Sequence, residues 1–94
     1  MDQQDEEPAA LADELHAELE ATEELPIDHR ANRWLGEAQA VAAEIREAPA
    51  ETRREGARQV IELLESIEET GSEEADERIE RALSLAERLA CDTG

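Results

Sequence analysis

The sequence predicts an all-α protein, an antiparallel up-and-down bundle of three to four helices. Apolar residues recur at steps of three and four along most of the 94-residue chain, as on one face of a helix. Prolines, glycines and capping residues divide this pattern into four segments, and their short connections favour antiparallel neighbours. We expect a single domain over residues 8–92, preceded by a disordered acidic tail at residues 1–7.

The first helix is expected to begin near Pro8, which suits a first helical turn, and to end at Leu25, because the residue before Pro26 avoids helical angles. Its buried stripe is Leu11, Ala12, Leu15, Leu19 and Thr22. The intervening proline leaves open a three-helix core with this helix loosely docked.

The second helix is expected to start after Asp28, a good N-cap, and to end before Pro49. Its apolar residues follow alternating steps of three and four: Ala31, Trp34, Ala38, Val41, Ile45 and Ala48, with Leu35 and Ala42 widening the stripe.

The third helix is expected from Pro49 or Glu51 to Thr70, with Gly71 as its C-terminal cap. Its stripe is Ala57, Val60, Ile61, Leu63, Leu64 and Ile67. Ser72 is the expected N-cap of a fourth helix that ends near Cys91. The fourth stripe is Ala75, Ile79, Ala82, Leu83, Ala86, Leu89 and Ala90.

Charge indicates adaptation to concentrated salt. The chain holds 27 acidic residues and nine basic ones, all arginine, for a net charge of −18. Such repulsion opposes folding in dilute buffer, but near 1 M salt the Debye length is only about 3 Å. Nucleic acid and anionic membranes are disfavoured as partners because they are themselves negative. The N-terminus lacks a secretory pattern and no apolar run is long enough for a bilayer, so we expect a cytoplasmic protein.

The second helix carries the candidate interface. Between Trp34 and Ala43 it has one charge, Glu37, in a chain that is 38% charged. Small residues opposite its main stripe permit close approach of another backbone, although alanine also simply favours helix. Since the apolar core is small, we expect a homodimer or other homo-oligomer, with another protein as a further partner. The candidate interface residues are Trp34, Leu35, Gly36, Ala40, Val41 and Ala43.

Arginines gather in the middle of the chain. Residues 28–60 hold six acids and six arginines, a net charge of zero, whereas residues 1–27 carry −10 and residues 61–94 carry −8. The arginines of this neutral segment can dock acidic helices of the bundle, dock a partner's acidic face, or form solvated ion pairs: Arg30, Arg33, Arg53, Arg54 and Arg58.

Two carboxylate patterns represent the alternative, an enzyme that handles a metal or a magnesium-bound nucleotide. Asp13, His16 and Glu20 share one side of the first helix, but a di-iron site needs a second carboxylate–His pair, which the sequence lacks.

The second pattern, Glu44/Glu47 with Glu73/Asp76, imitates a nucleotide pyrophosphatase arrangement, yet such spacings arise by chance in so acidic a chain. Cys91 is expected to be a small, partly buried residue without a catalytic role. We therefore expect no enzymatic activity, no metal site and no cofactor.

The absence of lysine, the excess of glutamate and the stretch ELPIDHRANRWLGEAQAVAAEI resemble small haloarchaeal proteins classified as domains of unknown function. The resemblance implies a salt-adapted source and carries no catalytic residue across. The function that these observations favour is a non-enzymatic, self-associating protein–protein interaction module.

Overall fold

The computed structural model describes residues 8–68 and 70–91, which form four α-helices and one short 3₁₀ helix and contain no strand. The helices are α1 (Pro8–Ala21), α2 (His29–Ile45), α3 (Ala50–Glu65) and α4 (Glu73–Ala90). The 3₁₀ helix η1 (Thr22–Glu24) follows α1 directly. The first helix therefore begins at the predicted proline, but its last predicted turn is 3₁₀ rather than α.

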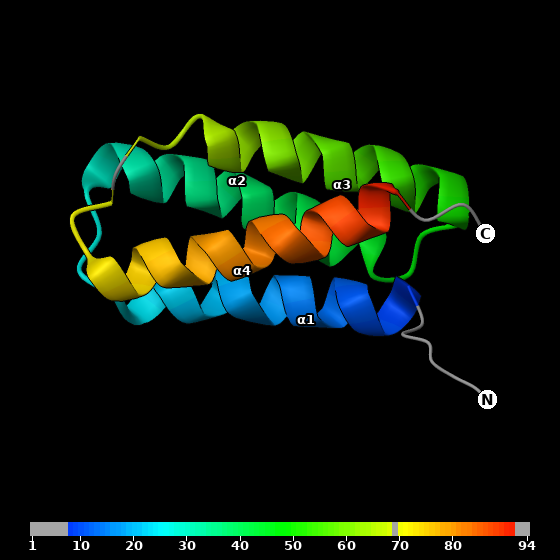
Figure 1. Cartoon of the computed structure of the whole chain (residues 1–94), viewed down its shortest axis with the longest axis horizontal. Coiled ribbons are helices and arrows are strands. Elements are labelled where there is room, and N and C mark those ends of the chain that lie inside the picture. Colours follow the sequence, from blue (N-terminus) through cyan, green and yellow to red (C-terminus); the bar gives the residue numbers. More distant parts are fainter. Residues whose placement is uncertain (1–7, 69, 92–94) are drawn as a thin grey trace.

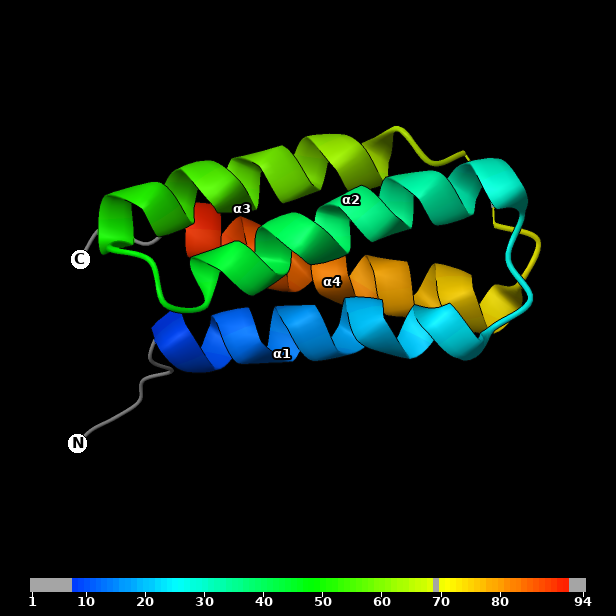
Figure 2. The same ribbon diagram turned by 180° about the vertical axis from the view of Figure 1, so that it is seen from behind.

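The four helices run alternately up and down, with α1 packed against α2 and α4, and α3 packed against the same two helices (Figures 1 and 2). The all-α bundle predicted from the sequence is confirmed. The open question about the first helix is also resolved, because Leu15 and Leu19 of α1 are fully buried. The helix is an integral quarter of the bundle.

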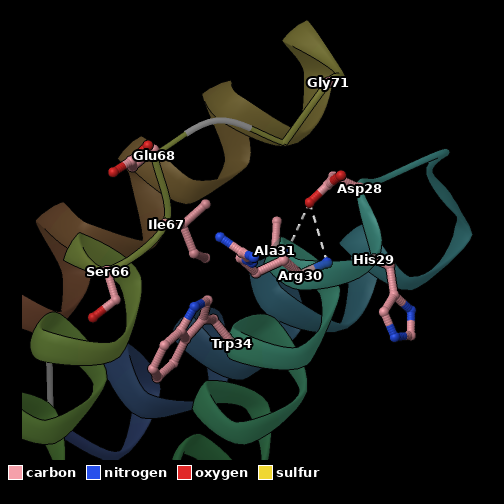
Figure 3. A pocket seen from close by; sticks show the side chains of 9 residues that line it. All are labelled: Asp28, His29, Arg30, Ala31, Trp34, Ser66, Ile67, Glu68 and Gly71. Carbon is pink, nitrogen blue, oxygen red and sulfur yellow. Dashed lines mark hydrogen bonds between the residues drawn. The ribbon is translucent and has the colours of Figure 1, made fainter.

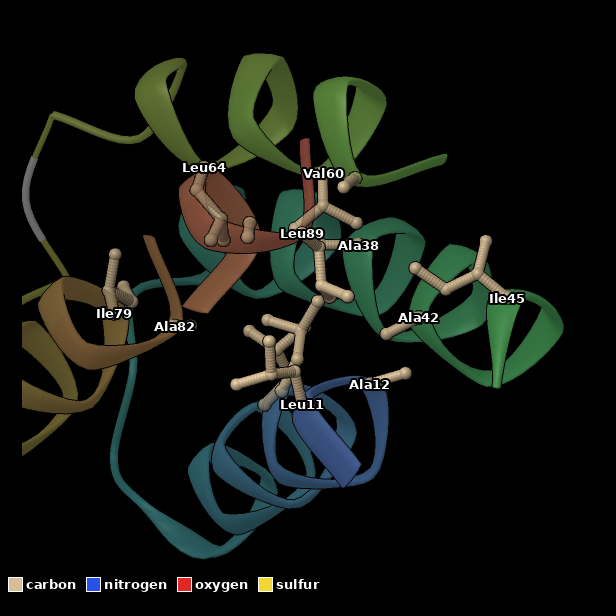
Figure 4. Packing of buried hydrophobic residues seen from close by; sticks show 14 of the residues in the cluster. Leu11, Ala12, Ala38, Ala42, Ile45, Val60, Leu64, Ile79, Ala82 and Leu89 are labelled. Carbon is tan, nitrogen blue, oxygen red and sulfur yellow. The ribbon is translucent and has the colours of Figure 1, made fainter. Parts of the chain in front are cut away.

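The core runs along the bundle axis and receives side chains from every α-helix (Figure 4). On α2 its centre differs from the predicted stripe, since Leu35 is 2% exposed whereas Trp34 and Val41 are only half-buried. The buried set on α2 is Ala31, Leu35, Ala38, Ala42 and Ile45. This helix is thus rotated so that Trp34 lies at the edge facing α3.

Both predicted N-caps are present. The Asp28 carboxylate accepts hydrogen bonds from the backbone N–H groups of Arg30 (3.1 Å) and Ala31 (3.4 Å), which lack partners within α2. The Ser72 hydroxyl accepts one from the Ala75 N–H at 3.3 Å. These two side chains fix where α2 and α4 begin, and both starts lie at the same end of the bundle (Figure 1).

The predicted end of the third helix at Thr70 is wrong, because α3 stops at Glu65. Thr70 lies beyond the end of the helix, is fully buried and makes hydrogen bonds to residues of other segments. Its carbonyl accepts from the Asp28 N–H at 2.7 Å, and its hydroxyl lies 2.8 Å from Asp76 Oδ1 and accepts from the Ser72 N–H at 3.0 Å. Gly71, with φ of 85°, turns the loop toward α4 and does not cap α3.

Cys91 is exposed, which corrects the predicted partial burial. It is the C-terminal cap residue of α4, two positions after the buried Leu89 and therefore about 200° further around the helix. The predicted disordered tail at residues 1–7 lies outside the described part of the chain, as does residue 92 at the predicted domain end.

Gly56 allows α3 to approach α2 closely. A Cβ atom on Gly56 would overlap Cγ2 of Ile45 and would lie 3.5 Å from Cγ1 of Val41. A Cβ on Gly36, by contrast, would meet no atom within 4 Å. The two helical glycines therefore have different roles: one is required by packing, and the other is not required by any contact within the described chain.

Substituting each glycine by alanine should have opposite effects. Gly56→Ala should lower the free energy of unfolding by about 1 kcal/mol, because the clash with a stiff β-branched side chain exceeds the gain in helix propensity. Gly36→Ala should raise it by roughly 0.5–1 kcal/mol. Chemical unfolding in concentrated salt, followed by circular dichroism, measures both; a destabilised Gly36→Ala would contradict the open surroundings of that residue.

Thr70→Val removes the hydroxyl that joins the loop to the start of α4 and leaves the Asp28–Thr70 backbone bond in place. Because the Ser72 N–H and the Asp76 carboxylate lose a buried partner, we expect a loss of about 1–2 kcal/mol in unfolding free energy. Thr70→Ser should retain most of the stability. Ser66→Ala, which removes an exposed hydroxyl at the other end of the same loop, should change it by less than about 0.5 kcal/mol.

Candidate functional site

The six candidate interface residues do not form one patch. Leu35 lies in the core, so its side chain contacts the chain's own interior. Trp34 and Val41 lie on the α3 side of α2, and Val41 is close to Gly56 of α3. The three small residues lie on the outward side of α2 and are exposed: Gly36, Ala40 and Ala43. At 3.6 residues per turn, Ala40 lies about 120° around the axis from Trp34.

Trp34 lines an open depression of about 810 Å³ at the N-terminal end of α2 (Figure 3). The opposite wall comes from the loop after α3, with Ser66 and Ile67. Figure 3 shows the Arg30 side chain reaching into the depression between Ile67 and the indole ring. Although half-buried, Trp34 does not belong to the apolar side chains packed against the core. The only aromatic residue of the chain is therefore a surface feature.

Ion pairs join α1 to its neighbours. Arg46, just after α2, binds Asp13 at 2.8 Å, and from α4 Arg78 and Arg81 bind Glu18 at 3.0 and 3.3 Å. These partly exposed pairs each contribute little stability, on the order of 1 kcal/mol or less. They show how the acidic first helix is docked: the arginines come from the end of α2 and from α4.

The other five arginines of the neutral segment, residues 28–60, are used differently from Arg46. Arg53 donates to the Ala48 carbonyl at 2.8 Å and to the Ile45 carbonyl at 3.4 Å, so it closes the C-terminal end of α2. Arg54 also has a partner. The guanidinium groups of Arg30, Arg33 and Arg58 have no ion-pair partner among residues 8–68 and 70–91. Arg30 and Arg33 both belong to the first turns of α2, next to the depression.

The carboxylates considered for catalysis are not brought together. Asp13 is engaged by Arg46, and within the described residues no three His, Cys, Asp or Glu side chains are grouped as metal ligands. Glu44 and Glu47 lie near the C-terminal end of α2, whereas Glu73 lies at the N-terminal end of α4, at the opposite end of the bundle (Figure 1). The nucleotide pattern in the sequence therefore does not form one site.

A second depression of about 530 Å³ lies between α1 and α4. Its lining is almost entirely charged, and it contains the Glu18–Arg81 pair. The only apolar lining residue is Leu85. The arrangement is that of a solvated ion-pair network, with Leu85 as its one apolar side chain for an organic ligand to contact.

No helix within the described part of the chain is both long and apolar enough to cross a membrane. The model of a family described as a domain of unknown function (DUF8152) matches residues 11–93. No curated protein and no solved structure matches the chain significantly. The match includes most of α1 and the whole of the other three α-helices, and it leaves the function to be argued from the structure.

Titration with divalent metal tests the separated carboxylates directly. Because Asp13 is paired with Arg46, and Glu44 and Glu47 lie at the opposite end of the bundle from Glu73, we expect no saturable heat when Mn²⁺, Fe²⁺ or a Mg²⁺-nucleotide is titrated in concentrated KCl. Isothermal calorimetry measures it. A stoichiometric, saturable heat that disappears in Asp13→Asn would contradict this interpretation and restore the metal-dependent alternative.

Proposed function

We propose that this chain, which belongs to the DUF8152 family, is a non-enzymatic protein–protein interaction module that self-associates through α2. The description of the family assigns no activity to it. The setting we propose is the salt-rich cytoplasm of a haloarchaeon. The observation that carries the proposal is the outward side of α2, where Gly36, Ala40 and Ala43 are exposed and uncharged. Trp34, half-buried and outside the core, lies at the α3 edge of the same helix, about 120° around the axis from Ala40. Aromatic residues are enriched in protein interfaces, where a large ring contributes contact area at small entropic cost.

The charge distribution over the fold supports contact through the same half of the bundle. The neutral segment, residues 28–60, contains α2 and most of α3, whereas α1 and α4 belong to the strongly negative segments. Two copies that met through α1 or α4 would bring their most acidic surfaces together. Contact through α2 brings together the surfaces with the least repulsion.

Concentrated salt makes this association feasible for a chain with a charge of −18. Screening shortens the range of repulsion to a few ångström near 1 M salt, so the copies repel only where charges nearly touch. On α2 the exposed small residues provide a zone without such charges, since Gly36, Ala40 and Ala43 are uncharged neighbours on one side. Self-association and salt adaptation are thus linked by one physical effect.

Light scattering behind a sizing column tests the proposal. In 2–3 M KCl we expect a multiple of the 10.4 kDa chain mass, and in dilute buffer we expect dissociation or unfolding. Ala40→Glu should reduce the mass in high salt to that of one chain, because it places a charge in the middle of the contact, while circular dichroism shows unchanged helicity.

Ala17→Glu is the matched control, since Ala17 is an exposed alanine on α1, away from the proposed contact. It should leave the mass unchanged. A single-chain mass for the unmodified protein in both solutions would refute self-association. An unchanged mass for Ala40→Glu would remove α2 as the contact.

A further inference from the structure

We propose that two copies pack α2 against α2 in antiparallel orientation, related by a two-fold axis near residues 38 and 39, with Arg33 of each copy paired to Glu44 of the other. The inference rests on the proposed self-association and specifies its geometry. The structural basis is one outward strip of residues on α2, which carries Arg33 near one end, Glu44 near the other, and Gly36, Glu37 and Ala40 between them.

Arg33 and Glu44 lie on the same line along α2. They are eleven residues apart, which is just over three full turns of an α-helix. Both are exposed, on the side of the helix opposite the buried Ala31, Ala38 and Ala42. Neither side chain has an ion-pair partner among the described residues. Arg33 and Glu44 are therefore an unpaired cation and an unpaired anion, aligned on an open helix face that also carries Glu37.

The pair is self-complementary under a two-fold rotation. The midpoint of the line falls between residues 38 and 39, with each charge about 8 Å from it along the axis. When a second α2 is laid antiparallel on this midpoint, Arg33 faces Glu44 of the second copy and Glu44 faces its Arg33. Symmetry makes the two ion pairs identical, which is the property of an isologous dimer. A parallel arrangement would set like charges opposite each other.

Small side chains allow the two helices to meet at this midpoint. Ala40 lies on the line between the two charges, and Gly36 lies beside it with open space around its Cα. Helices pack at about 8 Å when small residues form the contact, and this brings the flanking side chains within ion-pair reach. Glu37 lies near the axis at the α3 edge of the face, so the two copies' Glu37 side chains approach each other there.

Complementarity to itself favours a second copy over a foreign protein as the occupant. A two-fold contact requires a face that carries both charges of each ion pair on the same helix, and Arg33 and Glu44 meet that requirement on one exposed strip of α2. Across the rest of its surface the chain is acidic, so the few arginines without partners decide where two copies can meet.

Charge exchange distinguishes this geometry from any other. Arg33→Glu and Glu44→Arg should each weaken self-association at least about tenfold, because each places like charges together at both symmetric positions. An equimolar mixture of the two variants should regain dimers, since both ion pairs of the mixed dimer then join a glutamate of the first variant to an arginine of the second. Sedimentation equilibrium measures the dimer dissociation constants of the two single variants and of their mixture. The KCl concentration is the lowest at which all variants remain helical.

Two further variants check the assignment. Glu37→Gln should strengthen association several-fold by removing the repulsion near the axis. Arg58→Glu, a charge reversal at an exposed α3 position without an ion-pair partner in the described chain, is the matched control and should have an effect less than about twofold. Circular dichroism establishes that each variant remains folded.

The outcomes separate the two proposals. Dimers restored only in the mixture support the antiparallel pairing. Single variants that weaken association without restoration in the mixture overturn that pairing and leave self-association standing. A dimer indifferent to both reversals overturns the use of this face. A monomeric unmodified protein overturns self-association itself, and leaves the outward side of α2 to a foreign partner.

Discussion

The bundle depends on how closely its helices must approach one another. Without Phe or Tyr, the core is filled by leucines and by alanines that are completely buried on every α-helix: Ala12, Ala38, Ala42, Ala57, Ala75, Ala82 and Ala86. Such small side chains fill the interior to normal density only when the backbones are near each other. Gly56 is the limiting case, because even one methyl group there would overlap Ile45. The short connections and the caps at Asp28 and Ser72 serve this close packing by fixing where helices start.

Close packing also determines where the excess charge goes. The acidic side chains cannot enter so tight an interior, so they cover the outside. On α1, Asp13 and Glu18 are paired there with arginines from neighbouring segments. The arginines used for this purpose come from the end of α2 and from α4, whereas those in the first turns of α2 are left without ion-pair partners in the described chain. The surface is therefore strongly acidic over α1 and α4 and close to neutral over α2 and most of α3. This difference favours contact through the α2 and α3 half of the bundle.

The sequence predicted what depends on local chemistry and missed what depends on distant contacts. Hydrophobic periodicity and the capping chemistry of Asp28 and Ser72 predicted the four segments and two helix starts. Periodicity did not predict the end of α3 at Glu65, because Thr70, five residues further on, bonds to Asp28 of a distant segment instead of continuing the helix. Periodicity also placed Trp34 and Leu35 on one stripe, and only packing against α1 and α3 decides which of them is buried. The alignment of Arg33 with Glu44 was readable as a three-turn spacing, but its meaning required knowing which side of α2 faces outward.

The position of Trp34 at the surface determines what the intrinsic fluorescence of this protein reports. Since the chain contains no Tyr and no Phe, essentially all of its near-ultraviolet absorption and emission comes from this one indole ring. The ring lies at the mouth of the depression at the start of α2, with the Arg30 side chain nearby. The protein therefore carries a built-in optical reporter at one known place, and its emission describes the surroundings of that place alone rather than an average over the fold.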